Sequence, residues 1–479
     1  MIKFSFTRAK LASLALLAAG CGAVDPSEPT DESLGEAQSA LTAAKATAPS
    51  KFYIPPPDPG AVKQIAALLK ARDIVNAAKV TAMVTTPQAV WLTGGSPTEV
   101  EKSVKKTMKA AALEKRIPVL VAYNLPFRDC SQYSAGGAVD TAAYQAWIDG
   151  FAKGIGAAKA IVILEPDGLG IIPYNTTIYG QAEWCQPTVT AEDGTATPAP
   201  GASPEARYEQ LQYAVSALKA AAPGASVYLD GTHAGWLGVG EAAYRINKAS
   251  HDPSTGAALG STGFYLNTSN FQTTEQSVQF GTWVSMCTAF ATNPEEGGWR
   301  LGHFDWCASQ YNPAKDFALD YSPEYAATVT EQLQGLMGSA PASLPFVIDT
   351  SRNGKGAFDS AGYAAAPYLQ PPAVLSALNS GGWCNPVGAG LGVRPTSKTS
   401  VPLVDAYLWV KTPGQSDGSC DIAGGARAWD YSQYNPWGLS DTDEQNHFDP
   451  LWGRVDPAAG AWFPEQALQL AKNANPPLF

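Results

Sequence analysis

Short runs of apolar residues alternate along this chain with longer stretches that have a helical pattern. We predict helices over Glu99–Lys115, Ala142–Ala160 and Pro204–Ala221, which are rich in helix-forming residues. The short apolar runs are predicted to be strands, over Ile117–Tyr123, Ile161–Leu164, Val227–Leu229, Gly263–Leu266, Phe346–Ile348 and Val404–Val410. Because strands that alternate with helices are typical of a parallel sheet or barrel, we expect an α/β fold.

Polar residues follow each predicted strand. Asp129 follows the first strand, Asp167 the second and Asp417 the last. A single Asp at the end of a strand is most often a turn former or a helix cap. In an α/β barrel, however, the carboxyl ends of all strands share one face, and that face carries the chemistry. Three acids on one such face therefore predict an active site.

Composition limits the chemistry of this site. The formal net charge is −11 over 479 residues, and no stripe of lysine and arginine suits a nucleic-acid backbone. The sequence has neither the nucleophile elbow of α/β-hydrolases nor a phosphate-binding P-loop. It does contain 13 Trp and 19 Tyr, whose flat faces suit sugar rings. Paired carboxylates beside aromatic faces favour glycoside hydrolysis.

The N-terminus has the pattern of an export signal. Residues 1–20 combine a basic start with the apolar run Leu11–Ala19, which is too short to span a bilayer. Cys21 follows directly and is predicted to be lipidated, although an ordinary cleavage site near a cysteine is the alternative. Residues 21–50 are polar and are predicted to form a disordered tether, with the folded domain at 51–479. We therefore expect an exported bacterial outer-membrane or cell-surface lipoprotein, or otherwise a secreted protein.

The remaining cysteines point to disulfides rather than to a metal site. An exported chain with six such cysteines is expected to form three disulfides, for which fifteen pairings exist. No Cys-x-x-Cys occurs, and none of the four His residues lies in a zinc-binding His-Glu-x-x-His motif. The six are Cys130, Cys185, Cys287, Cys307, Cys384 and Cys420.

The strand-end motifs together resemble glycoside hydrolase family 6, the cellobiohydrolases and endoglucanases that cut β-1,4-glucan with inversion. The resemblance covers nearly all of residues 51–479. It implies a distorted α/β barrel with fewer than eight strands, a monomer, a cellulose-like substrate and no metal or organic cofactor. The motifs are Tyr123-Asn-Leu-Pro-Phe-Arg-Asp-Cys130, Val162-Ile-Leu-Glu-Pro-Asp167, Tyr228-Leu-Asp-Gly-Thr-His-Ala-Gly-Trp236, Asp349-Thr-Ser-Arg-Asn-Gly354, Trp383-Cys-Asn-Pro386 and Trp409-Val-Lys411 through Asp417-Gly418.

The resemblance also implies a role for each of these residues. Asp167 corresponds to the general acid, Asp129 to the neighbour that raises its pKa and assists proton movement, and Asp417 to a proposed base that acts through water. Tyr123 corresponds to a residue near the distorted sugar. Gln415 stands where the family usually has Glu, which removes a charge from that sugar-binding position. The other implied sugar contacts are Trp91, Asp230, His233, Trp236, Asn270, Trp383 and Lys411.

The resemblance implies a disulfide pairing as well. It matches Cys130 with Cys185 and Cys384 with Cys420, which leaves Cys287 with Cys307.

Long segments after three of the strands favour exo action. Residues 171–203, residues 272–344 and the stretch from Cys420 to about Gly460 carry aromatic residues and cysteines. In the resembled family, long loops roof the cleft into a tunnel that releases cellobiose from a chain end, which we expect to be the non-reducing end. The alternatives are an open-cleft endoglucanase and a surface glucan-binding lipoprotein without activity.

Overall fold

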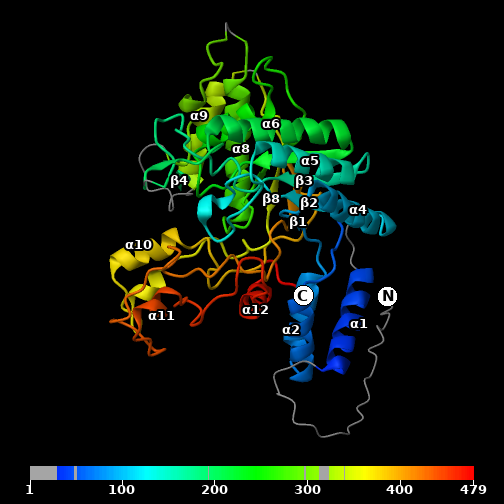
Figure 1. The fold of residues 1–479 in the computed structure, drawn as a ribbon, viewed down its shortest axis with the longest axis vertical. Coiled ribbons are helices and arrows are strands. Elements are labelled where there is room, and N and C mark those ends of the chain that lie inside the picture. The colour runs from blue at the N-terminus through cyan, green and yellow to red at the C-terminus, as the bar shows by residue number, and fades with distance from the viewer. Residues whose placement is uncertain (1–29, 48–50, 193, 296–297, 312–322, 339) are drawn as a thin grey trace, which may run out of the picture.

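The fold is organised by one sheet of parallel strands (Figure 1). The computed structural model describes residues 30–47, 51–192, 194–295, 298–311, 323–338 and 340–479. Seven strands pair in the order β1-β2-β3-β6-β7-β8-β9, and every pairing is parallel. This confirms the predicted α/β barrel with fewer than eight strands. The strands are β1 (Val90–Leu92), β2 (Val119–Ala122), β3 (Ala160–Leu164), β6 (Ala225–Asp230), β7 (Gly263–Leu266), β8 (Phe346–Asp349) and β9 (Val404–Leu408).

Both faces of this sheet are buried, which explains the continuous apolar runs of its strands. Side chains of β2 alternate between two cores, because successive residues of a strand point to opposite faces. Val119 and Val121 face an inner core, where they join Tyr228 of β6. Leu120 and Ala122 face the outer core, which the surrounding helices complete.

The helices cover the outer face of the sheet and extend beyond it. α6 has the predicted bounds, whereas α5 is shorter than predicted because Gly156 ends it at a positive φ and β3 begins at Ala160. The helices are α1 (Asp31–Thr47), α2 (Pro59–Lys70), α3 (Ile74–Val84), α4 (Pro97–Leu113), α5 (Thr141–Ile155), α6 (Pro204–Ala221), α7 (Val239–Ser250), α8 (Thr274–Ala291), α9 (Pro323–Met337), α10 (Pro372–Ser380), α11 (Thr442–Asn446) and α12 (Pro464–Lys472).

Helix α1 corrects part of the predicted tether at residues 21–50. Asp31–Thr47 is helical, and Figure 1 shows it beside α2. Ala37 and Leu41 lie one turn apart and are buried in a core that α2 shares, while Lys45 forms a 2.7 Å ion pair with Glu114. A narrow apolar stripe is therefore enough to dock this polar segment. The predicted signal at 1–20 and the lipidation site Cys21 lie outside the described residues, and no described helix is long and apolar enough to cross a membrane.

The long segments predicted to roof the active site differ among themselves. Within residues 171–203, strands β4 (Thr188–Thr190) and β5 (Ala196–Pro198) form a small exposed hairpin. Much of residues 272–344 is instead taken up by α8 and α9. Trp283 is one of the aromatic residues of the expected roof segment 272–344, but it lies in α8 and is only 1% exposed, so it belongs to the core and not to a roof.

All three predicted disulfides are confirmed. Cys130 is bonded to Cys185, Cys287 to Cys307, and Cys384 to Cys420. A disulfide of this kind typically stabilises a fold by about 2–4 kcal/mol. The first one joins the segment after β2 to the segment after β3, and these are the segments that carry Asp129 and Asp167.

Candidate active site

Asp129 and Asp167 follow neighbouring strands, and their charges influence each other. Asp167 follows β3, which pairs directly with β2, the strand that precedes Asp129. Burial raises the pKa of Asp167 well above its ordinary value, and the charges of Asp230 and Asp129 raise it further, against a weaker opposing effect of Lys411. Asp167 is therefore protonated at mildly acidic pH, which is the state that a general acid needs.

The surroundings of Asp129 raise the pKa of its carboxyl, but less than those of Asp167 raise the pKa of that acid. Burial raises the pKa of its carboxyl to about 6, although a hydrogen bond from the Ser134 N–H (2.7 Å) and the charge of Arg128 both favour the ionised form. Arg128 also donates to the Tyr123 carbonyl oxygen (2.6 Å) and lies over the Tyr123 ring. Asp129 can thus gain or lose a proton near pH 6.

Tyr123 and Trp91 form an aromatic wall beside these acids. Their rings pack edge to face with centroids 5.4 Å apart, and the Trp91 indole N–H donates to the Val410 carbonyl oxygen (2.8 Å). Burial raises the pKa of Tyr123 well above its ordinary value, and the nearby charge of Asp167 adds to this. Tyr123 is therefore a neutral phenol next to the candidate acid.

Asp417 has the opposite electrostatic environment. Its Oδ2 accepts from Arg352 (2.7 Å) and from the Asn385 N–H (3.0 Å), and its Oδ1 accepts from Lys411 (2.9 Å). Burial by itself raises the pKa of Asp417, but Arg352 and Lys411 together lower it to about 2. Because this carboxylate stays ionised and is fully engaged, it is better suited to polarise a water than to accept a proton directly.

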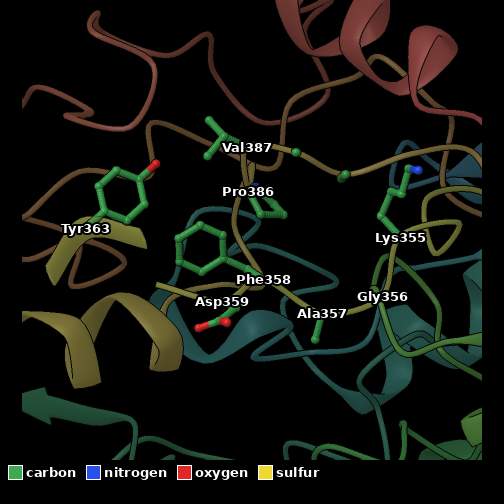
Figure 2. Close-up of a pocket in the computed structure, with 10 residues that line it drawn as sticks. Lys355, Gly356, Ala357, Phe358, Asp359, Tyr363, Pro386 and Val387 are labelled. Carbon is green, nitrogen blue, oxygen red and sulfur yellow. The ribbon is translucent and has the colours of Figure 1, made fainter. Parts of the chain in front are cut away.

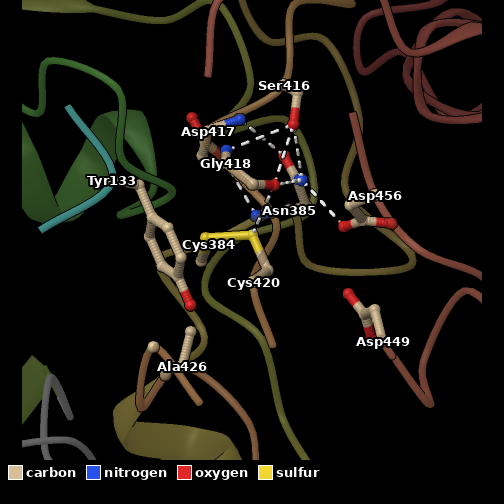
Figure 3. The surroundings of a disulfide bond; sticks show 12 residues. Tyr133, Cys384, Asn385, Ser416, Asp417, Gly418, Cys420, Ala426, Asp449 and Asp456 are labelled. Carbon is tan, nitrogen blue, oxygen red and sulfur yellow. Dashed lines mark hydrogen bonds between the residues drawn. A yellow bond between two sulfur atoms is a disulfide. The ribbon is translucent and has the colours of Figure 1, made fainter. Parts of the chain in front are cut away.

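Asn385 connects Asp417 to a buried polar network, which Figure 3 shows beside the Cys384–Cys420 disulfide. Its amide nitrogen donates to Ser416 Oγ (2.9 Å) and to Asp456 Oδ2 (2.9 Å), and its amide oxygen accepts from the Asp417 N–H (2.9 Å). Sequence reasoning did not identify Asn385 or Arg352 as site residues, although both lie within the strand-end motifs.

His233 and Trp236 lie together in the segment after β6. Their rings are 5.8 Å apart, and His233 Nδ1 accepts a hydrogen bond from the Gly235 N–H (2.9 Å). Burial lowers the pKa of His233 to about 4, so the ring is neutral at ordinary pH. Two other predicted sugar contacts, Asn270 and Trp383, are half-buried, and the Trp383 ring lies 6.0 Å from that of Tyr133.

Asp230 is only 3% exposed, which alters the role that the resemblance implied. Its Oδ2 accepts from the N–H groups of Leu169 and Gly170 (3.1 Å each), and its Oδ1 accepts from the Thr232 N–H (2.8 Å). Both oxygens are thus occupied by backbone. These contacts favour positioning of the segment after Asp167 over direct contact with sugar.

Gln415 is turned toward the N-terminal helices. Its amide nitrogen donates to Asp58 Oδ2 (3.0 Å), and Asp58 caps α2 by accepting from the Gly60 N–H through its other oxygen (2.7 Å). A Glu at position 415 would place its carboxylate about as close to the Asp58 carboxylate, and the two negative charges would repel. The neutral Gln avoids this repulsion and donates a hydrogen bond to Asp58 instead.

The segments that carry Asp129 and Asp167 have unusual backbone conformations. Phe127, Asp129, Glu165 and Asp167 all have positive φ angles between 53° and 65°, which are unfavourable for residues other than glycine. Such conformations persist only where the surroundings fix them. Both segments therefore need strong contacts from neighbouring elements.

Glu165 and Arg207 supply these contacts as a buried clamp between the two segments. Glu165 Oε2 accepts from the N–H groups of Asn124 (2.8 Å) and Leu125 (3.1 Å), which follow β2. Arg207 of α6 is 3% exposed. It donates to carbonyl oxygens of both segments, namely Pro126 (2.9 Å), Gly168 (2.9 Å) and Ile171 (2.6 Å).

Replacing Arg207 by Lys is expected to lower kcat by about 10-fold or more with little change in KM. The ammonium keeps the charge but cannot donate to three separated carbonyls, so the two acids lose their fixed geometry. The alkaline limb of the pH–rate profile, which reports Asp167, is expected to shift as well. Arg300→Lys is the matched control, with soluble cellotetraose as the substrate for both variants, because Arg300 is similarly buried but donates to Leu336 of α9. If kcat falls equally in both variants and neither pH–rate profile shifts, the contacts of Arg207 have no specific role in positioning the two acids.

Replacing Asp129 by Asn is expected to increase stability at neutral pH while lowering activity. The folded-state pKa of Asp129 is raised to about 6, so the wild type loses stability as the pH rises from about 4 through 6. The amide does not ionise and avoids this loss. Urea unfolding at pH 4 and pH 7 measures the difference in unfolding free energy between variant and wild type. A variant that is less stable than wild type at pH 7 would contradict the expectation.

Two cavities of the described structure are lined by residues other than these acids. The one in Figure 2, of about 220 Å³, lies between residues 355–363 and 386–389, and Phe358, Pro386 and Val387 line it. A groove of about 630 Å³ runs along the outside of α5 and α6. Neither contains a predicted site residue.

The comparisons with known proteins agree with this geometry. The family model described as "Glycosyl hydrolases family 6" matches residues 47–474, and the chain therefore belongs to this family. A relative from Cellulomonas fimi, named "Endoglucanase A", is 29% identical over 391 residues, which cover 81% of this chain and 55% of the relative. A second, named "Probable 1,4-beta-D-glucan cellobiohydrolase C", from Neosartorya fischeri, is 27% identical and covers 83% of this chain and 72% of its own length.

A solved structure of a cellulase has a similar fold. The endoglucanase Cel6 from Mycobacterium tuberculosis, in complex with a thio-linked methyl-cellobiosyl cellobioside, matches with a TM-score of 0.53 and 28% identity. The match covers 89% of this chain and 98% of that one. By contrast, this chain spans little more than half the length of the Cellulomonas relative.

Proposed function

We propose that this protein hydrolyses the β-1,4-glucosidic bonds of cellulose with inversion at the anomeric carbon. The observation that carries the proposal is the pair of opposite electrostatic environments at the carboxyl edge of one sheet. Asp167 has a raised pKa and is suited to donate a proton, whereas Asp417 has a pKa of about 2 and is suited to stay charged. Titratable groups whose pKa values are pushed apart mark acid and base roles.

The proposed reaction needs only groups of this chain and a water. Asp167 gives its proton to the glycosidic oxygen as the C–O bond breaks, while a water attacks the anomeric carbon from the opposite face. Asp417 polarises a second water, and the proton that the attacking water releases passes through this second water to solvent. Asp129, with a pKa near 6, then returns a proton to Asp167 from solvent.

Exo action that releases cellobiose from the non-reducing end is the finer form of this proposal. It is supported by the segment around Cys185 and the segment around Cys307, which are anchored by disulfides and carry exposed aromatic residues. The endoglucanase names of several relatives favour the second candidate, an endo-acting enzyme of the same family.

Product analysis separates these two candidates. For exo action, cellobiose dominates from the earliest time points, and the viscosity of carboxymethyl-cellulose falls slowly for each reducing end released. A rapid fall of viscosity with mixed oligomers would support endo action. If neither amorphous cellulose nor carboxymethyl-cellulose is hydrolysed, the third candidate, a glucan-binding lipoprotein without activity, is favoured.

We also propose that the protein is exported, monomeric and anchored through a lipid on Cys21. The disulfides support an oxidising compartment, because such bonds are rare where thiols are kept reduced. Metabolic labelling with a radioactive fatty acid tests the anchor. Label is expected in the wild type and absent from Cys21→Ser, and an unlabelled wild type would contradict lipidation.

A further inference from the structure

Exposed aromatic side chains are concentrated on two segments of the described structure. Four of them are strongly exposed, namely Tyr179 (50%), Trp184 (53%), Trp299 (44%) and Trp306 (48%). The first two precede Cys185, and the other two precede Cys307, so a disulfide anchors each segment. Because soluble proteins rarely leave clustered apolar side chains exposed without a use, this concentration indicates a binding surface.

Both segments dock on the first turns of α7. The N–H of Ile178 donates to Glu241 Oε2 (2.8 Å), and Glu183 forms an ion pair with Arg245. A Cβ on Gly240 would lie 2.2 Å from the Phe304 carbonyl oxygen and 2.6 Å from the Tyr179 hydroxyl oxygen. Tyr179 therefore meets the segment that carries Trp306, and the two segments form one surface.

The two tryptophans have the geometry of binding platforms. The guanidinium of Arg300 lies 4.4 Å from the centroid of the Trp299 ring, and His303 stacks on Trp306 at 3.8 Å. Trp299 is thus backed by a buried arginine and Trp306 by a partly exposed histidine, while nearly half of each tryptophan remains exposed. The ring centroids are 6.1 Å apart and the planes differ by 33°. The exposed parts of both rings can therefore contact a single extended ligand.

This surface continues into the segment that carries Trp236. The hydroxyl of Tyr311 donates to the Trp236 carbonyl oxygen (2.6 Å), and the amide of Gln310 donates to the Leu237 carbonyl oxygen (2.9 Å). The segment with Trp299 and Trp306 is thus attached directly to a predicted sugar-binding segment. A polymer bound at the active site could extend along both.

We propose that Tyr179, Trp299 and Trp306 form an auxiliary binding surface for a β-glucan chain, outside the active site. This inference rests on the proposed function, because it takes the polymer substrate as the ligand. A pyranose ring presents an apolar face of C–H groups and a polar edge of hydroxyls. Flat, half-exposed rings that the protein holds in place suit such a ligand better than the closely fitted pockets of a protein interface.

Adsorption to insoluble cellulose tests the proposal. The double variant Trp299→Ala/Trp306→Ala is compared with wild type and with Phe479→Ala, in which another exposed aromatic residue is lost at the C-terminus. We expect adsorption to microcrystalline cellulose to weaken about 10-fold in the double variant, because aromatic anchors dominate such contacts, and to stay unchanged in Phe479→Ala. Unchanged adsorption of the double variant would overturn the proposal.

A second variant separates ring contacts from folding. Trp299→Phe/Trp306→Phe keeps two flat rings and is expected to retain most of the adsorption, whereas equal loss in the Phe and Ala variants would overturn the stacking model. Hydrolysis of cellotetraose by the wild type is measured in parallel as the test of the proposed function. A wild type that adsorbs without hydrolysing would reject that function and retain the surface. Adsorption of the wild type to a protein-coated bead but not to cellulose would identify a protein surface instead.

Discussion

Replacing Asp167 by Asn is expected to lower the rate of cellulose hydrolysis by about 10²–10⁴-fold, the range typical of general acid catalysis. Burial and the charges of Asp230 and Asp129 keep the Asp167 carboxyl protonated, whereas the amide N–H is far too weak an acid to protonate the leaving oxygen. The amide is nearly isosteric, so binding of the polymer and KM are expected to change little. Steady-state kinetics on amorphous cellulose measures the effect.

Two controls make this result specific. Substrates with a good leaving group need little protonation, so hydrolysis of a dinitrophenyl cellobioside should be far less affected than that of cellulose. Asp443→Asn, at a carboxylate that is 89% exposed on α11, controls for loss of an acidic residue as such and should behave as wild type. Near-normal turnover of cellulose by Asp167→Asn would show that the acid lies elsewhere.

Replacing Asp417 by Asn is expected to abolish activity and to lower the free energy of unfolding by about 3–5 kcal/mol. The change deprives two buried cations, Arg352 (0% exposed side chain) and Lys411 (13%), of the carboxylate with which both are paired. It also leaves one neutral amide oxygen in place of the two carboxylate oxygens that accept from Arg352, Lys411 and the Asn385 N–H. Because this carboxylate belongs to a buried network and not to a surface ion pair, the loss should be measurable by urea unfolding.

The pH dependence of unfolding gives an independent signature of Asp417. Its folded-state pKa, about 2, is below the ordinary value of 3.8. The resulting stabilisation is therefore fully present above about pH 4 and is lost as the pH falls through 2. Wild type and Asp417→Asn should differ most above pH 4 and converge toward pH 2. A difference that is constant with pH would show that the carboxylate charge is not the cause.

The sequence predicted the parts of the fold that have a strong local pattern. Six strands were predicted because each is a continuous apolar run, whereas β1 was missed because three residues carry too little periodicity. Helix α1 was missed because its polar composition hides the stripe made by Ala37 and Leu41. The aromatic content of residues 272–344 likewise did not show that Trp283 is buried, since exposure is set by packing and not by residue type.

The acids of the candidate site were proposed from strand ends and motifs. Asp129, Asp167 and Asp417 each follow a predicted strand, and parallel strands bring their carboxyl ends to one edge. That these three acids act in catalysis stays a prediction. The groups that fix these acids come from elsewhere. Arg207 lies within helix α6, well beyond Asp167 in the chain, and only packing brings it to the segments of the acids. The environment of Asp417 likewise depends on Arg352, which lies at the end of another strand.

The anomeric form of the first product tests the central claim most directly. Direct attack of water opposite to the bond that Asp167 protonates inverts the anomeric carbon, so hydrolysis of cellohexaose followed by proton NMR should show the α-anomer first. The β-anomer should then appear only at the rate of mutarotation. If the β-anomer forms first, the reaction proceeds with retention, and the proposed roles of Asp167 and Asp417 are wrong.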